Sequence, residues 1–247
     1  MPGRRLLGVL WLVSVASCGG SRVRTLPPPE RLLAEARRAF RQGDFQRAQL
    51  TFQRLTFELP PGHSDLPEVR YFLAESYFQR GDRAQAAAEF RRVADSYATS
   101  PYAPLALLRA GDAHLRMWRR PELDPSPGQT ALAIYQELVG RYPGSEAAAR
   151  AGLHVRQLRE WFAEKAYKNG MFYFRRKAYD SAIIYFKEVV ANYADTPHAA
   201  DALLRLVDTY RAVGYREELE ETCTHLRRFY PEADGLAERC AAASGAG

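Results

Sequence analysis

A repeated pairing of one small and one large side chain constrains the fold of this chain most strongly. Four segments place an alanine four residues before an aromatic ring, namely Ala48/Phe52, Ala86/Phe90, Ala131/Tyr135 and Ala182/Phe186. Because four residues make about one turn of an α-helix, each pair lies on one helix face. A stop signal follows each of these rings seven residues later, and a fifth segment contains one as well. The five stop signals are Leu59-Pro60, Tyr97, Tyr142-Pro143, Tyr193 and Tyr230-Pro231. Proline cannot continue a helix, so the repeats predict helices with matching ends.

Turn-forming residues precede most of these helices, and a second amphipathic helix precedes each turn. The turns are 42–44, 80–82, 176–179 and 213–215, and the preceding helices include 68–79 and 164–174. A small residue at a helix contact with a ring filling the gap is typical of tetratricopeptide repeats. We therefore predict an all-α superhelical solenoid of about five helix pairs. The alternative is an unrelated helical bundle whose spacing coincides.

The repeats also predict the domain organisation. We expect units at about residues 30–62, 66–101, 103–145, 160–197 and 199–232, within a repeat region spanning 30–240 that includes a short C-terminal helix. Residues 241–247 are small and predict a disordered tail. The rings are more than 34 residues apart, so the units are extended and two of them carry insertions.

The start of the chain predicts export. Arg4 and Arg5 precede an apolar run over residues 6–15, which is too short to span a bilayer. Small residues follow at 15–17, and then Cys18. This context resembles the bacterial lipobox, which implies that 1–17 is a lipoprotein signal peptide and that Cys18 carries a diacylglycerol and an N-acyl chain. The alternative is an ordinary signal peptide.

Residues 18–29 follow the predicted cleavage site and predict a tether. They contain Gly19, Gly20 and the run Pro27-Pro28-Pro29, and proline-rich sequence is extended and semi-rigid. In lipoproteins, glycine rather than aspartate after the cysteine implies delivery to the outer membrane. An anchored, exported protein does not meet genomic DNA, so the net charge of +6 does not indicate nucleic-acid binding.

No pattern of catalytic, metal-binding or cofactor-binding residues emerges. The five histidines lie in different segments without metal-ligand spacing, and His63-Ser64-Asp65 falls in a polar connector. We therefore predict a protein that is not an enzyme and holds no metal or cofactor. The four glutamates at 217, 218, 220 and 221 indicate either a solvated helix face or an acidic partner surface.

Cys223 stands where the other units have a ring, and Cys240 follows 17 residues later. Cys223 is interpreted either as a small buried core residue or as one half of a disulfide, because an exported chain meets an oxidising compartment.

The inner face of the solenoid is the candidate binding surface, because the first helix of each pair lines it. We expect the positions that a unit does not need for its own core to face this surface. These positions carry aromatic rings and arginines, which are the residue types that concentrate binding energy. They are Leu33, Arg37, Phe40 and Arg41 in the first unit, Tyr71, Glu75 and Phe78 in the second, and Tyr167, Met171, Phe174 and Arg175 in the fourth. We expect Leu73 and Tyr77 to fill the core of the second unit. The alternative is that neighbouring units bury these rings.

Two segments, 166–197 and 124–145, together with the lipobox, tether and repeats, resemble the family of BamD-like outer-membrane assembly lipoproteins. The chain departs from this family in a short proline-rich insertion in the third unit and in Ala194, where proline is usual.

The resemblance implies a non-catalytic protein anchored to the periplasmic face of the bacterial outer membrane. It implies that the later units hold the barrel-forming (BamA-like) assembly subunit beside other assembly lipoproteins. The first two units would receive a terminal segment of an unfolded outer-membrane protein. A scaffold for peptidoglycan or other envelope machinery, built on the same repeats, is the alternative.

Overall fold

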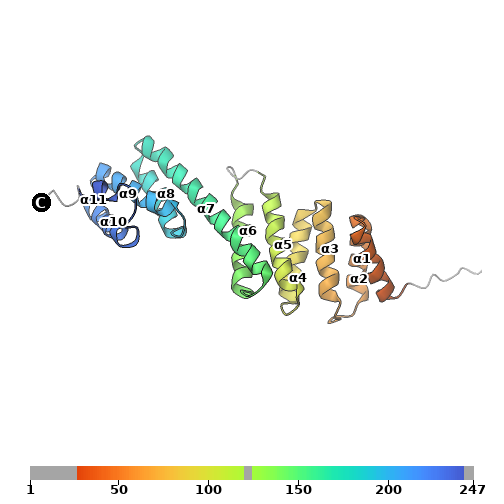
Figure 1. Cartoon of the computed structure of the whole chain (residues 1–247). Coiled ribbons are helices and arrows are strands. Elements are labelled where there is room, and N and C mark those ends of the chain that lie inside the picture. The colour runs from red at the N-terminus through yellow and green to blue at the C-terminus, as the bar shows by residue number, and fades with distance from the viewer. Residues whose placement is uncertain (1–26, 120–123, 242–247) are drawn as a thin grey trace, which may run out of the picture.

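The computed structural model describes residues 27–119 and 124–241, and every regular element in these ranges is an α-helix. The helices form an elongated row of antiparallel pairs (Figure 1). Three pairs make up the first half. They are α1 (Pro29–Arg41) with α2 (Phe45–Glu58), α3 (Leu66–Arg80) with α4 (Arg83–Ser96), and α5 (Tyr102–Met117) with α6 (Ser126–Arg141).

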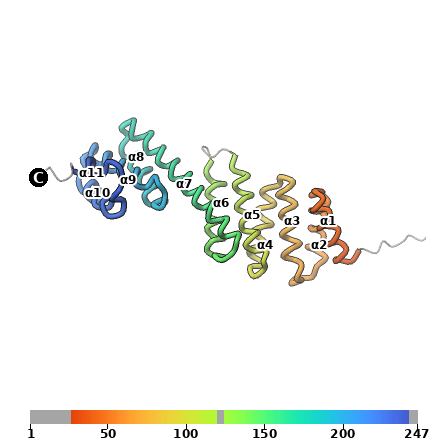
Figure 2. The backbone as a smooth tube through the Cα atoms, in the orientation of Figure 1, coloured from red at the N-terminus to blue at the C-terminus, as the bar shows by residue number. Residues whose placement is uncertain are grey.

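A single long helix, α7 (Glu146–Arg175), connects this half to the second half (Figure 2). The second half contains α8 (Tyr179–Asn192), α9 (His198–Val213), α10 (Arg216–Phe229) and the short α11 (Leu236–Ala241). The beginning of α7 packs on α5 and α6, and its end packs on α8 and α9. The fourth unit therefore begins with a helix that starts at Glu146, before the predicted boundary at 160. One hydrophobic core ends at Phe162 and the next begins at Ala163.

The small-and-large pattern of the sequence forms the contacts within each pair. All four repeated alanines and all four rings are fully buried. The helices α2, α4, α6, α8 and α10 each end one residue before the predicted stop. At two places the partner of the ring is glycine. A Cβ atom on Gly111 would lie 2.4 Å from the Tyr135 ring, and one on Gly170 would lie 2.5 Å from Phe186. The pattern predicted both the packing and the helix ends.

The turns inside the units need a left-handed residue. Gly81 has φ +90° after α3, and Lys177 takes the same region with φ +60° between α7 and α8. Only glycine adopts this conformation without a steric penalty, so Lys177 is a strained position. Backbone hydrogen bonds hold this turn, from the Lys177 N–H to the Phe174 carbonyl at 2.9 Å and from the Ala178 N–H to the Tyr173 carbonyl at 3.1 Å.

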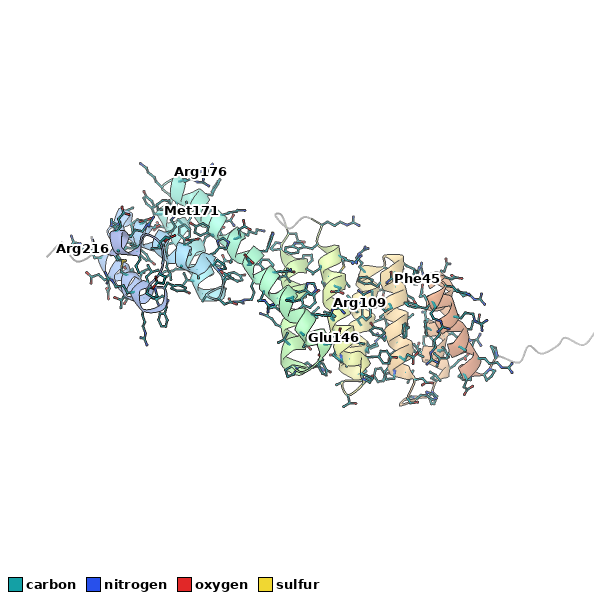
Figure 3. The ribbon with its side chains drawn as sticks, in the orientation of Figure 1. Phe45, Arg109, Glu146, Met171, Arg176 and Arg216 are labelled. Carbon is teal, nitrogen blue, oxygen red and sulfur yellow. A yellow bond between two sulfur atoms is a disulfide. The ribbon has the colours of Figure 1, made fainter. Side chains whose placement is uncertain are left out.

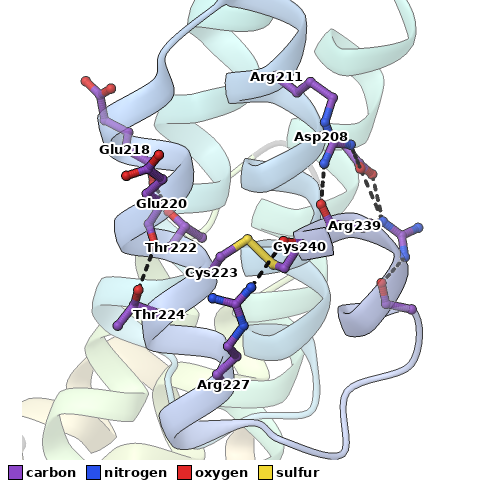
Figure 4. Close-up of a disulfide and its surroundings, with 11 residues drawn as sticks. Asp208, Arg211, Glu218, Glu220, Thr222, Cys223, Thr224, Arg227, Arg239 and Cys240 are labelled. Atoms are coloured by element: carbon purple, nitrogen blue, oxygen red, sulfur yellow. Dashed lines mark hydrogen bonds and ion pairs between the residues drawn. A yellow bond between two sulfur atoms is a disulfide. The ribbon is translucent and has the colours of Figure 1, made fainter. Parts of the chain in front are cut away.

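The last helix is fixed by a disulfide between Cys223 of α10 and Cys240 of α11, which decides the question the sequence left open (Figure 4). Both residues are also fully buried. Arg227 donates a 3.1 Å hydrogen bond to the Cys240 carbonyl, and Arg239 pairs with Asp208 of α9 at 3.1 Å. The end of the solenoid is therefore closed by one covalent bond and two charged side chains.

The anchor and the tail lie outside the described residues. The signal peptide, Cys18 and most of the tether fall within 1–26, and residues 242–247 belong to the predicted tail. Within the described ranges, none of the helices combines the length and the apolar character that a membrane span requires.

Candidate functional site

The odd-numbered helices form the inner face, because α1 contacts α3, α3 contacts α5, α5 contacts α7 and α7 contacts α9. An ion pair joins the first two. Arg37 of α1 donates to both oxygens of Glu68 of α3, from Nε at 2.6 Å and from an Nη at 2.7 Å. This hydrogen bonding raises the pKa of Arg37. A two-point contact of this kind fixes the spacing and the orientation of the two helices.

A second ion pair joins α3 to α5. Arg109 binds both oxygens of Glu75, at 2.5 and 2.8 Å, and also contacts Asp112 at 3.0 Å. Tyr71 donates a 3.3 Å hydrogen bond to Glu75, and Tyr135 donates one of 2.8 Å to Asp112. Glu75 is only 7% exposed, so these partners stabilise a carboxylate that water barely reaches.

Arg109 and the two phenols of this network keep their protons near neutral pH. Burial lowers the pKa of Arg109, but its bonds and attraction to Glu75 and Asp112 outweigh burial, so the pKa lies above its ordinary value. Burial and the neighbouring carboxylates raise the pKa values of Tyr71 and Tyr135. Both phenols therefore act as hydrogen-bond donors.

Four rings lie between the two ion pairs, and we call Phe40, Tyr71, Phe72 and Tyr102 the aromatic surface. All four are half-buried. Tyr71 and Tyr102 are 5.2 Å apart between ring centroids, Tyr71 and Phe72 are 5.4 Å apart, and Phe40 meets Phe72 edge-on at 5.1 Å. The first helices of three successive units thus contribute to one continuous apolar strip.

The expectation that Glu75 and Phe78 are free to bind a partner is wrong. Phe78 is 6% exposed, and the Arg109 guanidinium carbon lies over its ring, 3.9 Å from the ring centroid. Glu75 is the buried partner of the same arginine. Leu33 is also buried. The core of the second unit contains Leu73 and Phe78, with Tyr77 half-buried. The helices α2, α4 and α5 all pack against α3. A single amphipathic stripe predicts burial on one side of α3 only, so more of its surface is buried than the sequence pattern indicates.

The other predicted residues of the first half keep some exposure. Arg37, Phe40 and Tyr71 are half-buried at the inner face, and Arg41 is exposed. Sequence reasoning missed Glu68, Tyr102, Arg109 and Asp112, which complete the same surface. A signal was available, because Tyr102 and Arg109 are seven residues apart and therefore share one face of α5.

The four residues predicted in the fourth unit lie near the end of α7, in the other half of the molecule, as Figure 3 shows for Met171. Tyr167 stacks on His198, Met171 and Phe174 pack against the second core, and Arg175 is exposed at the end of α7. The structure does not bring them together with the aromatic surface, since Tyr71 and Tyr102 pack against one core and Met171 packs against another. The two groups define separate surfaces.

The described side chains contain no cluster of three or more metal-ligating residues. Stacked helix pairs, an inner face with rings and paired charges, and buried small-to-ring contacts define a tetratricopeptide-type helical repeat protein.

The chain belongs to the YfiO outer membrane lipoprotein family, whose family model matches residues 27–226.

Two characterised relatives cover most of the chain. The outer membrane protein assembly factor BamD of Vibrio cholerae is 28% identical over 90% of this chain and 96% of its own length. The protein of the same name from Caulobacter vibrioides is 25% identical over 93% of this chain and 77% of its own length. The likeness therefore extends over both halves of the molecule.

Proposed function

We propose that this protein is an outer-membrane protein assembly factor, anchored through Cys18 on the periplasmic side. In this role it holds a barrel-forming assembly subunit and engages unfolded outer-membrane proteins. The observation that carries the proposal is the family match over residues 27–226, supported by relatives named as assembly factors along nearly their full length. The family consists of assembly factors, and the proposed role requires no catalysis.

The aromatic surface supplies the physical basis for client binding. The charges of Arg37–Glu68 and Arg109–Glu75 beside it are already paired, so an incoming segment meets mainly half-buried rings, with the exposed Arg41 at one end. Aromatic and aliphatic side chains of an unfolded barrel protein fit such a strip, and ring burial at a binding surface stabilises a complex strongly. The proposal therefore predicts client binding that depends weakly on salt.

A pull-down from detergent-solubilised membranes of the source bacterium, with the full tagged chain as bait, tests the scaffold role. We expect recovery of a barrel-forming assembly protein in a stable complex. Recovery of peptidoglycan synthases without any barrel-assembly protein would overturn the proposal in favour of envelope-machinery scaffolding. A chain carrying Cys18→Ala should not be lipidated and should be either uncleaved or released as a soluble form. Continued membrane fractionation of a cleaved, unlipidated variant would contradict the anchor.

Client binding is tested with peptides that copy the terminal strand of an outer-membrane barrel protein. Tyr102→Ala removes a ring of the aromatic surface and should weaken binding at least about tenfold, as expected for an aromatic anchor. Phe57→Ala is the matched control, because this α2 ring is 82% exposed and belongs to a different helix face. Equal affinities of the Tyr102→Ala and Phe57→Ala variants would show that the peptide does not use the aromatic surface.

A further inference from the structure

The second helices of neighbouring units are joined in the first half of the molecule. Arg91 of α4 pairs with Glu137 of α6 at 2.5 Å, and Arg141 of α6 reaches Asp95 of α4 at 3.6 Å. Arg141 also donates to the Ala94 carbonyl at 3.3 Å. The space between α4 and α6 is therefore crossed by side chains of opposite charge.

The corresponding space between α8 and α10 is open. Within the described ranges, neither an ion pair nor a hydrogen bond connects residues of the two helices themselves. Just beyond their ends, the Tyr230 hydroxyl after α10 donates a 3.0 Å hydrogen bond to the Ala194 carbonyl after α8. A groove of about 450 Å³ lies there. Its floor is formed by Leu203, Leu206 and Tyr210 of α9, which packs against both helices.

The two walls of the groove differ in charge. Lys187, Val190 and Ala191 form the α8 wall, whereas Glu218, Glu221, Thr222 and His225 form the α10 wall. No ion pair in the described part of the chain uses either of these glutamates or their neighbours Glu217 and Glu220. The α10 wall thus presents unneutralised carboxylates beside an apolar floor.

Exposed apolar side chains lie about one helical turn from wall residues of the groove on both α8 and α10. Ile184, one turn before Lys187 on α8, is 66% exposed, and Phe229, one turn after His225 on α10, is 56% exposed. These two side chains are available to extend the apolar contact of a partner seated in the groove.

We propose that the groove between α8 and α10 docks a helical segment of a partner protein, with an apolar face and arginine or lysine along the edge that meets α10. Parallel helices with an apolar floor between them suit an amphipathic helix, whose spaced apolar residues would enter the groove. The acidic wall selects a basic edge, because like charges across an interface are strongly disfavoured. This groove is separate from the aromatic surface, so the proposal stands independently of client binding there.

Direct binding of a defined probe tests the proposal. The probe is a fluorescent 18-residue helical peptide with leucines at helical spacing and arginines along one edge, and a second peptide carries glutamates in place of the arginines. Anisotropy titrations use the full mature chain in detergent. We expect the arginine peptide to bind and the glutamate peptide to bind at least about tenfold more weakly. Equal binding of the two peptides, or no binding of either, would overturn the proposal.

Variants locate the binding to the groove. Glu218→Lys/Glu221→Lys should lower the affinity for the arginine peptide at least about tenfold and raise the affinity for the glutamate peptide. The matched control, Glu217→Lys/Glu232→Lys, changes the net charge equally but replaces residues that do not line the groove, so it should change affinity less than about twofold. Equal losses in both variants would mean general charge attraction and would refute the site.

A steric block checks the same groove without changing its charge. Ala191 is exposed and lines the α8 wall, so Ala191→Trp should abolish peptide binding, while Ala133→Trp on the exposed side of α6 should leave it intact. Normal binding by Ala191→Trp would contradict docking in the groove.

A photo-crosslinker at position 191 in native membranes should label a basic, apolar segment of another protein. Labelling of phospholipid or of a second copy would exclude the proposed occupant.

Discussion

The two halves of the molecule are built from the same helix pairs but are held together differently. In the first half, ion pairs join successive units on the inner face, through Arg37–Glu68 and Arg109–Glu75, and on the other side through Arg91–Glu137. In the second half, a disulfide closes the end, and the space between α8 and α10 stays open.

The disulfide follows from the position of the last unit in the row. A unit in the middle has neighbours on both sides, so its charged side chains find partners across two interfaces. The last unit lacks a following neighbour, and α11 covers only part of its exposed side. A short helix of six residues buries too little apolar surface to stay docked by packing alone, so a covalent bond replaces a missing neighbour.

Removing the disulfide should give the largest effect and should be confined to the second half. The bond links residues 17 positions apart, and a loop of this size contributes about 3 kcal/mol to stability. Cys223→Ala/Cys240→Ala should lower the melting temperature, and hydrogen exchange should speed up in α9–α11 but not in α1–α6. Faster exchange across the whole chain would show that the two halves unfold as one unit.

Breaking the inner-face network should destabilise the first half instead. Arg109→Met leaves the Glu75 carboxylate buried without its cation, and we expect a loss of about 2 kcal/mol, since Arg109 itself retains partial exposure. The matched control is Arg47→Met, because the Arg47–Glu35 pair is largely exposed and should contribute little. Urea unfolding, monitored by tyrosine and tryptophan fluorescence, measures the free energy of unfolding of both variants. Equal stabilities of the two variants would contradict a structural role for the network.

Glycine positions in α7 test the ring contact of the second half. Gly170→Ala places a Cβ 2.5 Å from the Phe186 ring, and the resulting overpacking should cost about 1 kcal/mol even after the gain in helix propensity. Gly152→Ala in the same helix meets no atom within 4 Å and should stabilise by up to about 1 kcal/mol. Thermal melts of the two variants should therefore shift in opposite directions. Shifts of the same sign would show that Gly170 is not in close contact with the ring.

Mild acid should give the smallest effect and should act on the first half. Burial lowers the pKa of His114 in α5, so the unfolded chain binds a proton at a higher pH than the folded chain does. Stability is therefore fully present above the unfolded pKa of about 6.5 and falls as the pH drops toward the folded pKa. The protection factors of the α5 amides, which are exchange rates corrected for the intrinsic effect of pH, should fall as the pH drops from 7.5 to 5.5. His114→Gln removes the titrating group and should abolish this difference, and an unchanged pH response would exclude His114 as the cause.

The sequence by itself determined the second helix of each pair, the residue at which it ends and the small and large side chains that pack inside the unit, but not the start of α7 at Glu146. Ala182 and Phe186, or Ala86 and Phe90, are neighbours on one helix turn, and proline or tyrosine seven residues later marks the end of the helix. These features depend on local periodicity and on the backbone preferences of single residues, so they can be predicted without knowing the neighbouring units.

Only the tertiary structure decided which side chains remain available for partners. Tyr71 and Phe78 occupy one face of α3, yet α5 supplies Arg109 above Phe78 and buries that ring, while Tyr71 keeps an exposed edge. The bond between Cys223 and Cys240 and the open groove beside α10 depend likewise on how separate helices meet. Exposure is a property of the contacts between helices, and residues far apart in sequence create those contacts. For this reason the repeat pattern predicted the architecture but not its binding surfaces.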